Sequence, residues 1–168
     1  MATPKTNLLR YHLRFQVLPG KDAQGDAAVL ARFCAAHGIE EVVLFFAAEE
    51  WNNGLLSREE EDLWFETIKG VKTVLDKAGV ITSLNPWMTV LHCDRGRSFP
   101  EDRAFKPMVS PTGQASQSCA SFADPGWRTY IDQLYGRFAQ LDFRVIWIED
   151  DFRSVSYTHL TLPTSDQV

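Results

Sequence analysis

Short, continuous apolar runs alternate with capped helical segments along this chain, and this alternation most constrains what the chain can fold into. Three runs stand out: 41–47 (EVVLFFA), 79–84 (GVITSL) and 143–148 (FRVIWI). A continuous apolar run is typical of a strand that is covered on both faces, as in a parallel sheet. Residues 8–19 (LLRYHLRFQVLP) supply a further strand near the start of the chain. The pattern predicts four parallel strands separated by helices.

Three helices are predicted between these strands from capping residues and apolar spacing. Asp26 and Gly38 mark the ends of the first, Ser57 opens the second with the spacing of a capping box, and Asp124 followed by Pro125 opens the third. The apolar residues expected to pack inward are Val29, Leu30, Phe33 and Cys34 in the first helix, Trp64, Ile68, Val71, Leu75 and Ala78 in the second, and Trp127 or Tyr130, Ile131, Leu134, Phe138 and Leu141 in the third.

Four strands and three helices correspond to half of an eight-fold barrel, which needs about 250 residues. We therefore expect an α/β fold of parallel strands alternating with helices, a partial (β/α)8 TIM barrel truncated after strand 4, in residues 1–153. The alternative is a complete, small doubly wound sheet. After the first strand, LPGKDAQGD contains neither a G-x-G-x-x-G pattern nor a phosphate-binding loop, so no nucleotide cofactor is predicted.

The composition excludes several kinds of partner. A net charge of -5 without a cluster of Lys and Arg disfavours nucleic acid. No stretch approaches the roughly 18 apolar residues of a membrane span, and the N-terminus lacks the apolar core of a secretory signal, so we expect a cytoplasmic protein. Cys34, Cys93 and Cys119 are too far apart for a C-x-x-C pair and are expected to be free thiols.

Residues 154–168 differ from the rest of the chain. They are rich in Ser and Thr and have no helical periodicity, which is typical of a disordered tail. SVSYTHLTLPTS, over about residues 155–165, resembles a peptide produced by translated sequencing-adaptor read-through at the ends of metagenomic assemblies. We expect a non-native or disordered tail and a natural reading frame that is interrupted near Arg153.

Three consecutive acids follow the last apolar run and are the candidate catalytic residues: Glu149, Asp150 and Asp151. In an α/β barrel the working groups lie at the carboxyl ends of the strands. Period-two alternation places Glu149 and Asp151 on one side of the strand and Asp150 on the other. Crowded carboxylates repel one another, which raises at least one pKa and separates an acid from a base or nucleophile. Alternatively, Asp150 or Asp151 pairs with Arg153 and caps the following helix.

Three segments carry a family resemblance. Residues 124–153 (DPGWRTYIDQLYGRFAQLDFRVIWIEDDFR) resemble the third helix and fourth strand of TIM-barrel glycoside hydrolases, in which a Trp-Arg-x-Tyr helix precedes a strand that runs into a catalytic or substrate-binding acid. Residues 45–54 (FFAAEEWNNG) and 84–96 (LNPWMTVLHCDRG) are similar to the loops after the second and third strands of such enzymes. The resemblance implies a sugar substrate and catalysis by two carboxylates, one of which matches Asp150 or Asp151. The second is expected from a later strand, so the fragment itself would be inactive.

The predicted loops also suit a carbohydrate on chemical grounds. Sugars need fixed hydrogen-bonding groups for their hydroxyls and aromatic rings for their apolar faces, and loops as long as the one before Asp124 are usually functional. The candidate substrate-binding residues are Glu49, Glu50, Trp51, Asn52, Asn85, Trp87, His92, Asp94, Arg95 and Arg153.

Two other classes stay open. In a divalent-metal-dependent lyase or isomerase barrel, four residues would hold Mg²⁺ or Mn²⁺, namely Glu149, Asp151, His92 and Asp94, although no close pair of ligands supports a metal. In a non-catalytic carbohydrate-binding domain the contact residues would be Trp51, Trp87 and Trp127. In any half barrel the open strand edges predict self-association.

Overall fold

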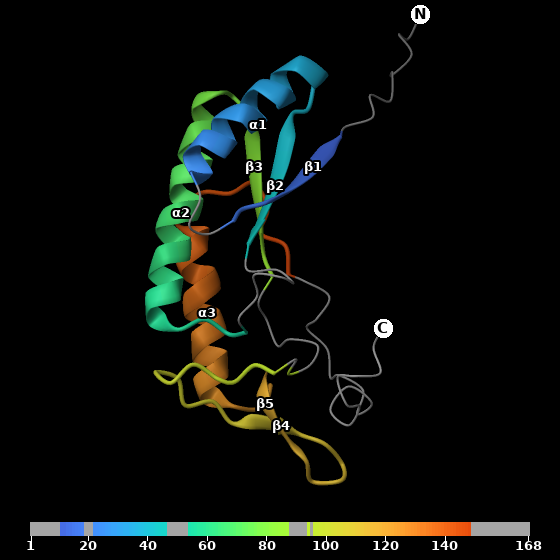
Figure 1. Cartoon of the computed structure of the whole chain (residues 1–168), viewed down its shortest axis with the longest axis vertical. Helices are drawn as coiled ribbons and strands as arrows, with labels where there is room; N and C mark the ends of the chain where they lie inside the picture. The colour runs from blue at the N-terminus through green and yellow to red at the C-terminus, as the bar shows by residue number, and fades with distance from the viewer. Residues whose placement is uncertain (1–10, 19–21, 47–53, 88–93, 95, 149–168) are drawn as a thin grey trace, which may run out of the picture.

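A parallel sheet with helices on one side organises the part of the chain that the computed structural model describes, which is residues 11–18, 22–46, 54–87, 94 and 96–148 (Figure 1). The elements in chain order are β1 (His12–Gln16), α1 (Ala23–His37), β2 (Glu41–Phe46), α2 (Arg58–Lys77), β3 (Ile81–Pro86), β4 (Pro107–Val109), β5 (Ala115–Ala120) and α3 (Pro125–Ala139). The sheet has the order β1-β2-β3, and both pairs of strands are parallel. The predicted alternation of parallel strands with helices is confirmed.

The segment predicted as a fourth strand lies along β3. Ile146 forms a parallel bridge with Leu84. The Leu84 amide donates to the Val145 carbonyl at 2.9 Å, and the Trp147 amide donates to the Leu84 carbonyl at 2.8 Å. The segment therefore adds to the sheet on the far side of β3 from β2, although in the described residues it is an isolated bridge rather than a full strand.

The main core fills the space between the sheet and the helices. Val42, Leu44 and Phe46 alternate along β2 and are buried in this core. The Phe46 ring lies 5.0 Å from the Trp64 ring of α2 and 5.1 Å from the Phe138 ring of α3, measured between centroids. All three helices lie on the same side of the sheet in Figure 1.

Helices α2 and α3 begin where the sequence predicts. Ser57 accepts a hydrogen bond from the Glu60 amide while Glu60 accepts one from the Ser57 amide, so the predicted capping box is present. Asp124 caps α3 by accepting from the Trp127 amide. Of the apolar residues predicted to pack inward, Trp64, Ile68, Val71, Leu75, Trp127, Tyr130, Leu134 and Phe138 are buried, whereas Ile131 and Leu141 are partly buried and Ala78 is the C-cap of α2.

Helix α1 differs from the prediction at its start and on its packing face. Its N-cap is Asp22, which accepts from the Gly25 amide, so the prediction of Asp26 as the cap was wrong. Asp26 lies in the first turn instead, where an acid is favourable to the helix dipole. The buried stripe combines Leu30 and Cys34 with small alanines, and Val29 and Phe33 are exposed rather than packed inward.

An antiparallel ribbon, β4–β5, occupies part of the segment that was predicted to be a long loop. Val109 pairs with Ala115, and Pro107 pairs with Ala120 across an irregular register. Figure 1 shows the ribbon at the end of the molecule where α3 begins. Within the described residues, no helix is long and apolar enough to cross a membrane.

Candidate functional site at the carboxyl edge of the sheet

The carboxyl ends of β1, β2 and β3 meet at one edge of the sheet. The register places Gln16 beside Phe45 and Phe45 beside Asn85, so these residues lie at one level on three neighbouring strands. They belong to the face of the sheet opposite the helices, because their neighbours along each strand belong to the core. This face is called the open face below.

Arg14 of β1 crosses toward this edge on the open face. Its guanidinium carbon lies 4.7 Å from the centroid of the Phe45 ring and 5.8 Å from that of the Trp87 ring. A guanidinium at such a distance is attracted to the ring faces and keeps its N–H donors in its own plane. The group formed by Arg14, Phe45, Asn85 and Trp87, called the edge cluster, therefore combines cationic donors, a side-chain amide and aromatic surface.

Contacts from α3 position the end of β3. The Tyr135 hydroxyl donates to the Pro86 carbonyl at 3.3 Å, immediately before Trp87. Asn85 is 7% exposed and is held in the sheet by pairing with Phe45. The backbone at the end of β3 is therefore held by β2 and by Tyr135 of α3.

Asp94, predicted as a substrate-binding residue, accepts hydrogen bonds from residues of β5. Its Oδ1 accepts hydrogen bonds from the Ser116 hydroxyl, the Ser118 hydroxyl and the Ser118 amide, and its Oδ2 accepts from the Gln117 amide. Burial alone would raise the pKa of Asp94, but these hydrogen bonds hold the pKa below its usual value. Asp94 is thus a carboxylate anchor for β5.

At the amino ends of the strands, a second polar group lies on the open face. Glu41 accepts from the Ser83 hydroxyl at 2.6 Å and from Arg144 at 2.7 Å, and His12 Nδ1 lies 3.4 Å from its other carboxylate oxygen. Burial alone would raise the pKa of Glu41, but these hydrogen bonds and the charges of His12 and Arg144 hold it below the usual value. The residues of this group were not predicted from the sequence, although an acid at the start of an otherwise apolar run is a signal for it.

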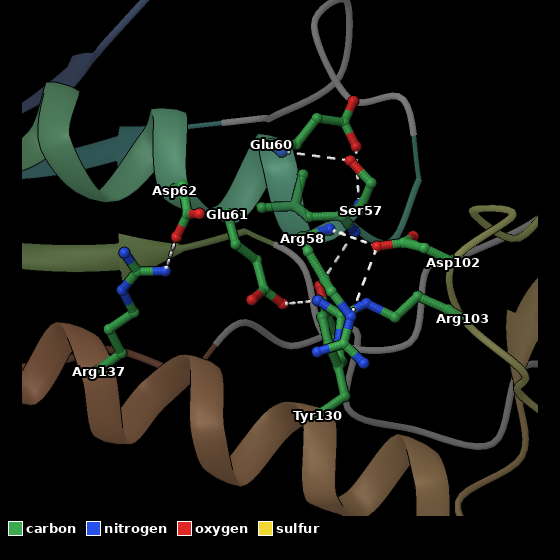
Figure 2. A network of polar contacts seen from close by, with 10 residues as sticks. Ser57, Arg58, Glu60, Glu61, Asp62, Asp102, Arg103, Tyr130 and Arg137 are labelled. Atoms are coloured by element: carbon green, nitrogen blue, oxygen red, sulfur yellow. Dashed lines mark hydrogen bonds and ion pairs between the residues drawn. The ribbon is translucent and has the colours of Figure 1, made fainter.

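A third polar network fastens the 98–105 loop to α2 and α3 (Figure 2). Arg103 donates to Glu61 and lies over the Tyr130 ring at 4.9 Å. The Tyr130 hydroxyl accepts from the Leu56 amide, and burial raises the pKa of Tyr130 well above its usual value. Burial also raises the pKa of Glu61, against the opposing charge of Arg103. These contacts hold the loop that leads into the β4–β5 ribbon.

The structure brings together Asn85 and Trp87 among the predicted site residues and adds Arg14, which was missed. A signal for Arg14 was present, because His12, Arg14 and Gln16 alternate with apolar residues in β1. The predicted residues outside the described part of the chain are Glu49, Glu50, Trp51, Asn52, His92, Arg95, Glu149, Asp150, Asp151 and Arg153. Among the residues that are described, no three His, Cys, Asp or Glu side chains gather in a way that could hold a metal ion.

Comparison with known proteins adds no assignment. No protein-family model matches the sequence, and no curated protein matches it.

Proposed function

We propose that this chain is the N-terminal half of a TIM-barrel glycoside hydrolase domain, and that sugar binds at the carboxyl edge of its sheet. The observation that carries the proposal is the edge cluster, in which the guanidinium of Arg14 lies over the Phe45 and Trp87 rings and Asn85 pairs with Phe45 across the sheet. Ring faces suit the apolar face of a sugar, and the guanidinium and amide suit its hydroxyls.

The order of the strands supports the barrel part of the proposal. β1, β2 and β3 are neighbours in chain order, and the Ile146 segment follows on the next edge. Because crossovers between parallel strands are right-handed, strands that always add on the same edge place every helix on the same face. This arrangement is expected of a barrel wall and supports the proposal, whereas a doubly wound sheet reverses direction and has helices on both faces.

The proposed chemistry uses the acids that follow the Ile146 segment. In this proposal Asp150 or Asp151 acts as acid, base or nucleophile, with Glu149 beside it. A second carboxylate comes from a later strand, about 5–5.5 Å away for retention or about 6.5–9.5 Å for inversion of the sugar configuration. The edge cluster holds the sugar while this pair acts, and the 168-residue chain binds without hydrolysing.

Sugar binding is tested by affinity electrophoresis of the full chain in gels that contain soluble polysaccharides. We expect retardation by at least one polysaccharide, and loss of this retardation in Trp87→Ala. The matched control is Phe33→Ala, which removes another ring, 47% exposed, from the surface of α1. Retardation by no polysaccharide, or equal retardation of the Trp87 and Phe33 variants, would contradict the proposed site.

The hydrolase part is tested by sequencing the source DNA across the codons for Arg153 and Ser154. The proposal requires a frame that continues into four more strand–helix units with another acid at a strand end. In that full-length protein, Asp150→Asn should abolish turnover and preserve binding, and chelators should leave the activity intact. A natural frame that stops at Val168 would refute the half-barrel proposal.

A further inference from the structure

A cavity of about 440 Å³ lies between the first turns of α2 and α3, under the 98–105 loop. Its principal polar and aromatic lining residues are Arg58, Asp102, Arg103, Phe105, Thr129 and Gln133. The edge cluster does not contribute to this lining. Arg58 and Arg103, drawn as sticks in Figure 2, both line the cavity, and so does Tyr130.

Arg103 is a buried cation with unused hydrogen-bonding capacity. Its side chain is 8% exposed, one terminal nitrogen donates to Glu61, and its Nε–H has no hydrogen-bond partner. Solvent does not reach this Nε, and Arg103 is among the residues that line the cavity. A buried donor without an acceptor is uncommon in folded proteins, so the polar groups that line the cavity beside it are of interest.

Arg58 supplies a second guanidinium to the same cavity. Its side chain is 72% exposed, and its Nε lies 3.8 Å from the Asp102 carboxylate, which is beyond hydrogen-bonding distance. The stronger contact of Asp102 is with the Arg58 backbone amide at 2.8 Å, at the start of α2. The guanidinium of Arg58 can therefore turn to an incoming anion while Asp102 remains bound to the helix.

The other lining groups suit a polyhydroxylated molecule better than a bare ion. Thr129 and Gln133 are one helical turn apart on α3, so their hydroxyl and amide lie on the same face. Phe105 presents an aromatic ring, and Asp102 can accept from a hydroxyl. The acids that face the two arginines are Asp102 and Glu61, and each already accepts a hydrogen bond from the protein.

We infer that this cavity binds a small anionic saccharide, with Arg58 and Arg103 on its carboxylate or phosphate group and with Thr129, Gln133 and Asp102 on its hydroxyls. Arginine is suited to both oxyanions because its planar donors match their paired oxygens. This site is separate from the edge cluster and does not depend on the proposed hydrolase activity.

The test is calorimetric titration of the full chain with glucuronate, glucose 6-phosphate, inorganic phosphate and glucose. We expect saturable binding of one or both sugar anions, weakened as the salt concentration rises, and no binding of glucose. Preference between the two sugar anions identifies the oxyanion as carboxylate or phosphate ester. Arg58→Gln should weaken binding about tenfold or more, because it removes charge-assisted hydrogen bonds that an exposed side chain would make to the anion.

The matched control is Arg128→Gln, which removes another exposed arginine from the first turn of α3, outside the cavity lining. This variant should bind as the unmodified chain does, and Gln133→Ala should weaken the binding of the sugar anions more than the binding of inorganic phosphate.

Binding of inorganic phosphate alone would show an adventitious ion only and would overturn the inference. So would absence of binding, or equal affinities of the Arg58 and Arg128 variants. Trp87→Ala should leave the binding of sugar anions unchanged, so a failure of this site can be distinguished from a failure of the proposed sugar site at the edge cluster.

Discussion

Replacement of Asp94 by asparagine is expected to loosen the β4–β5 ribbon while the sheet and helices stay folded. The carboxylate accepts four hydrogen bonds from Ser116, Gln117 and Ser118. Asparagine keeps the shape of the side chain and removes its charge and one of its two acceptor atoms. The change therefore isolates the anchor from packing effects.

The magnitude follows from which donors lose their partner. The asparagine nitrogen fits best in place of Oδ2, which serves only the Gln117 amide, because that amide is at an exposed position where water replaces the lost acceptor. The three bonds to the other oxygen become neutral, and neutral hydrogen bonds contribute about 0.5–1.5 kcal/mol against about 1.5–3 kcal/mol for charged ones. With partial exposure reducing each difference, we expect a loss of about 2 kcal/mol, or about 30-fold in the local opening equilibrium.

Amide hydrogen exchange measures this opening directly. The Ser118 amide, which donates to Asp94, should exchange about 30-fold faster in Asp94→Asn, while the Leu84 amide, bonded across the sheet, keeps its protection. The control is Asp132→Asn, which changes an exposed aspartate on α3. Unchanged exchange at Ser118 would refute the anchor role of Asp94, and equal acceleration at Leu84 would refute its confinement to the ribbon.

Acid gives an independent check of the same residue. Its pKa in the folded chain is below the usual 3.8, because its hydrogen bonds outweigh the effect of burial. The ionised form therefore favours the folded ribbon, and the contribution is complete above about pH 3.8 and is lost as the pH falls through the lower folded pKa. The Asp94→Asn chain should lack this acid-dependent loss of Ser118 protection.

Three further substitutions test the core, a helix cap and the open face by urea unfolding. Phe138→Ala, at a fully buried ring, should lower the free energy of unfolding by about 3–5 kcal/mol. The control Leu63→Ala, at a side chain that is 54% exposed, should change it by less than about 0.5 kcal/mol. Similar losses in the two variants would contradict the assigned core. Ser57→Ala should cost about 1 kcal/mol, and no loss would mean that the capping box does not form in solution. Glu41→Gln should cost about 1–3 kcal/mol by weakening the contact with Arg144. Burial alone would raise the pKa of Glu41, but its hydrogen bonds and neighbouring charges keep the pKa below 4.5. The unmodified chain should therefore lose this contribution as the pH falls through the folded pKa, and its free energy of unfolding should approach that of the variant. Parallel pH profiles of the two chains would contradict this.

The sequence predicts an element well where its signal is local. The start of α2 follows from Ser57 and Glu60, and the start of α3 from Asp124 and Pro125, since each pair is within a few residues of the helix end that it caps. The start of α1 is ambiguous because Asp22 and Asp26 can both cap a helix, and the structure uses the earlier one. Burial of side chains on α1 depends on neighbouring helices, which the apolar spacing alone does not identify.

The ribbon could not be predicted because what holds it is not local. β5 is ASQSCA, a sequence with little preference for a strand. Its Ser116 is bonded to Asp94, which lies 22 residues earlier in the chain. The same limit applies to the candidate site. Asn85 and Trp87 follow a recognisable strand, whereas the stacking of Arg14 on Phe45 and Trp87 depends on strand order and register.

The open face of the sheet carries polar groups that bond to one another within the sheet. In a doubly wound sheet this face would be covered by helices and would need apolar side chains. Here Glu41 is 5% exposed and bonds laterally to Ser83 of the next strand and to Arg144 of the segment beyond it, with His12 of β1 on its other side. Side chains from neighbouring strands thus satisfy one another at one level of the sheet and need no helix above them. The described helices therefore lie on one face of the sheet, and the polar group around Glu41 lies on the other.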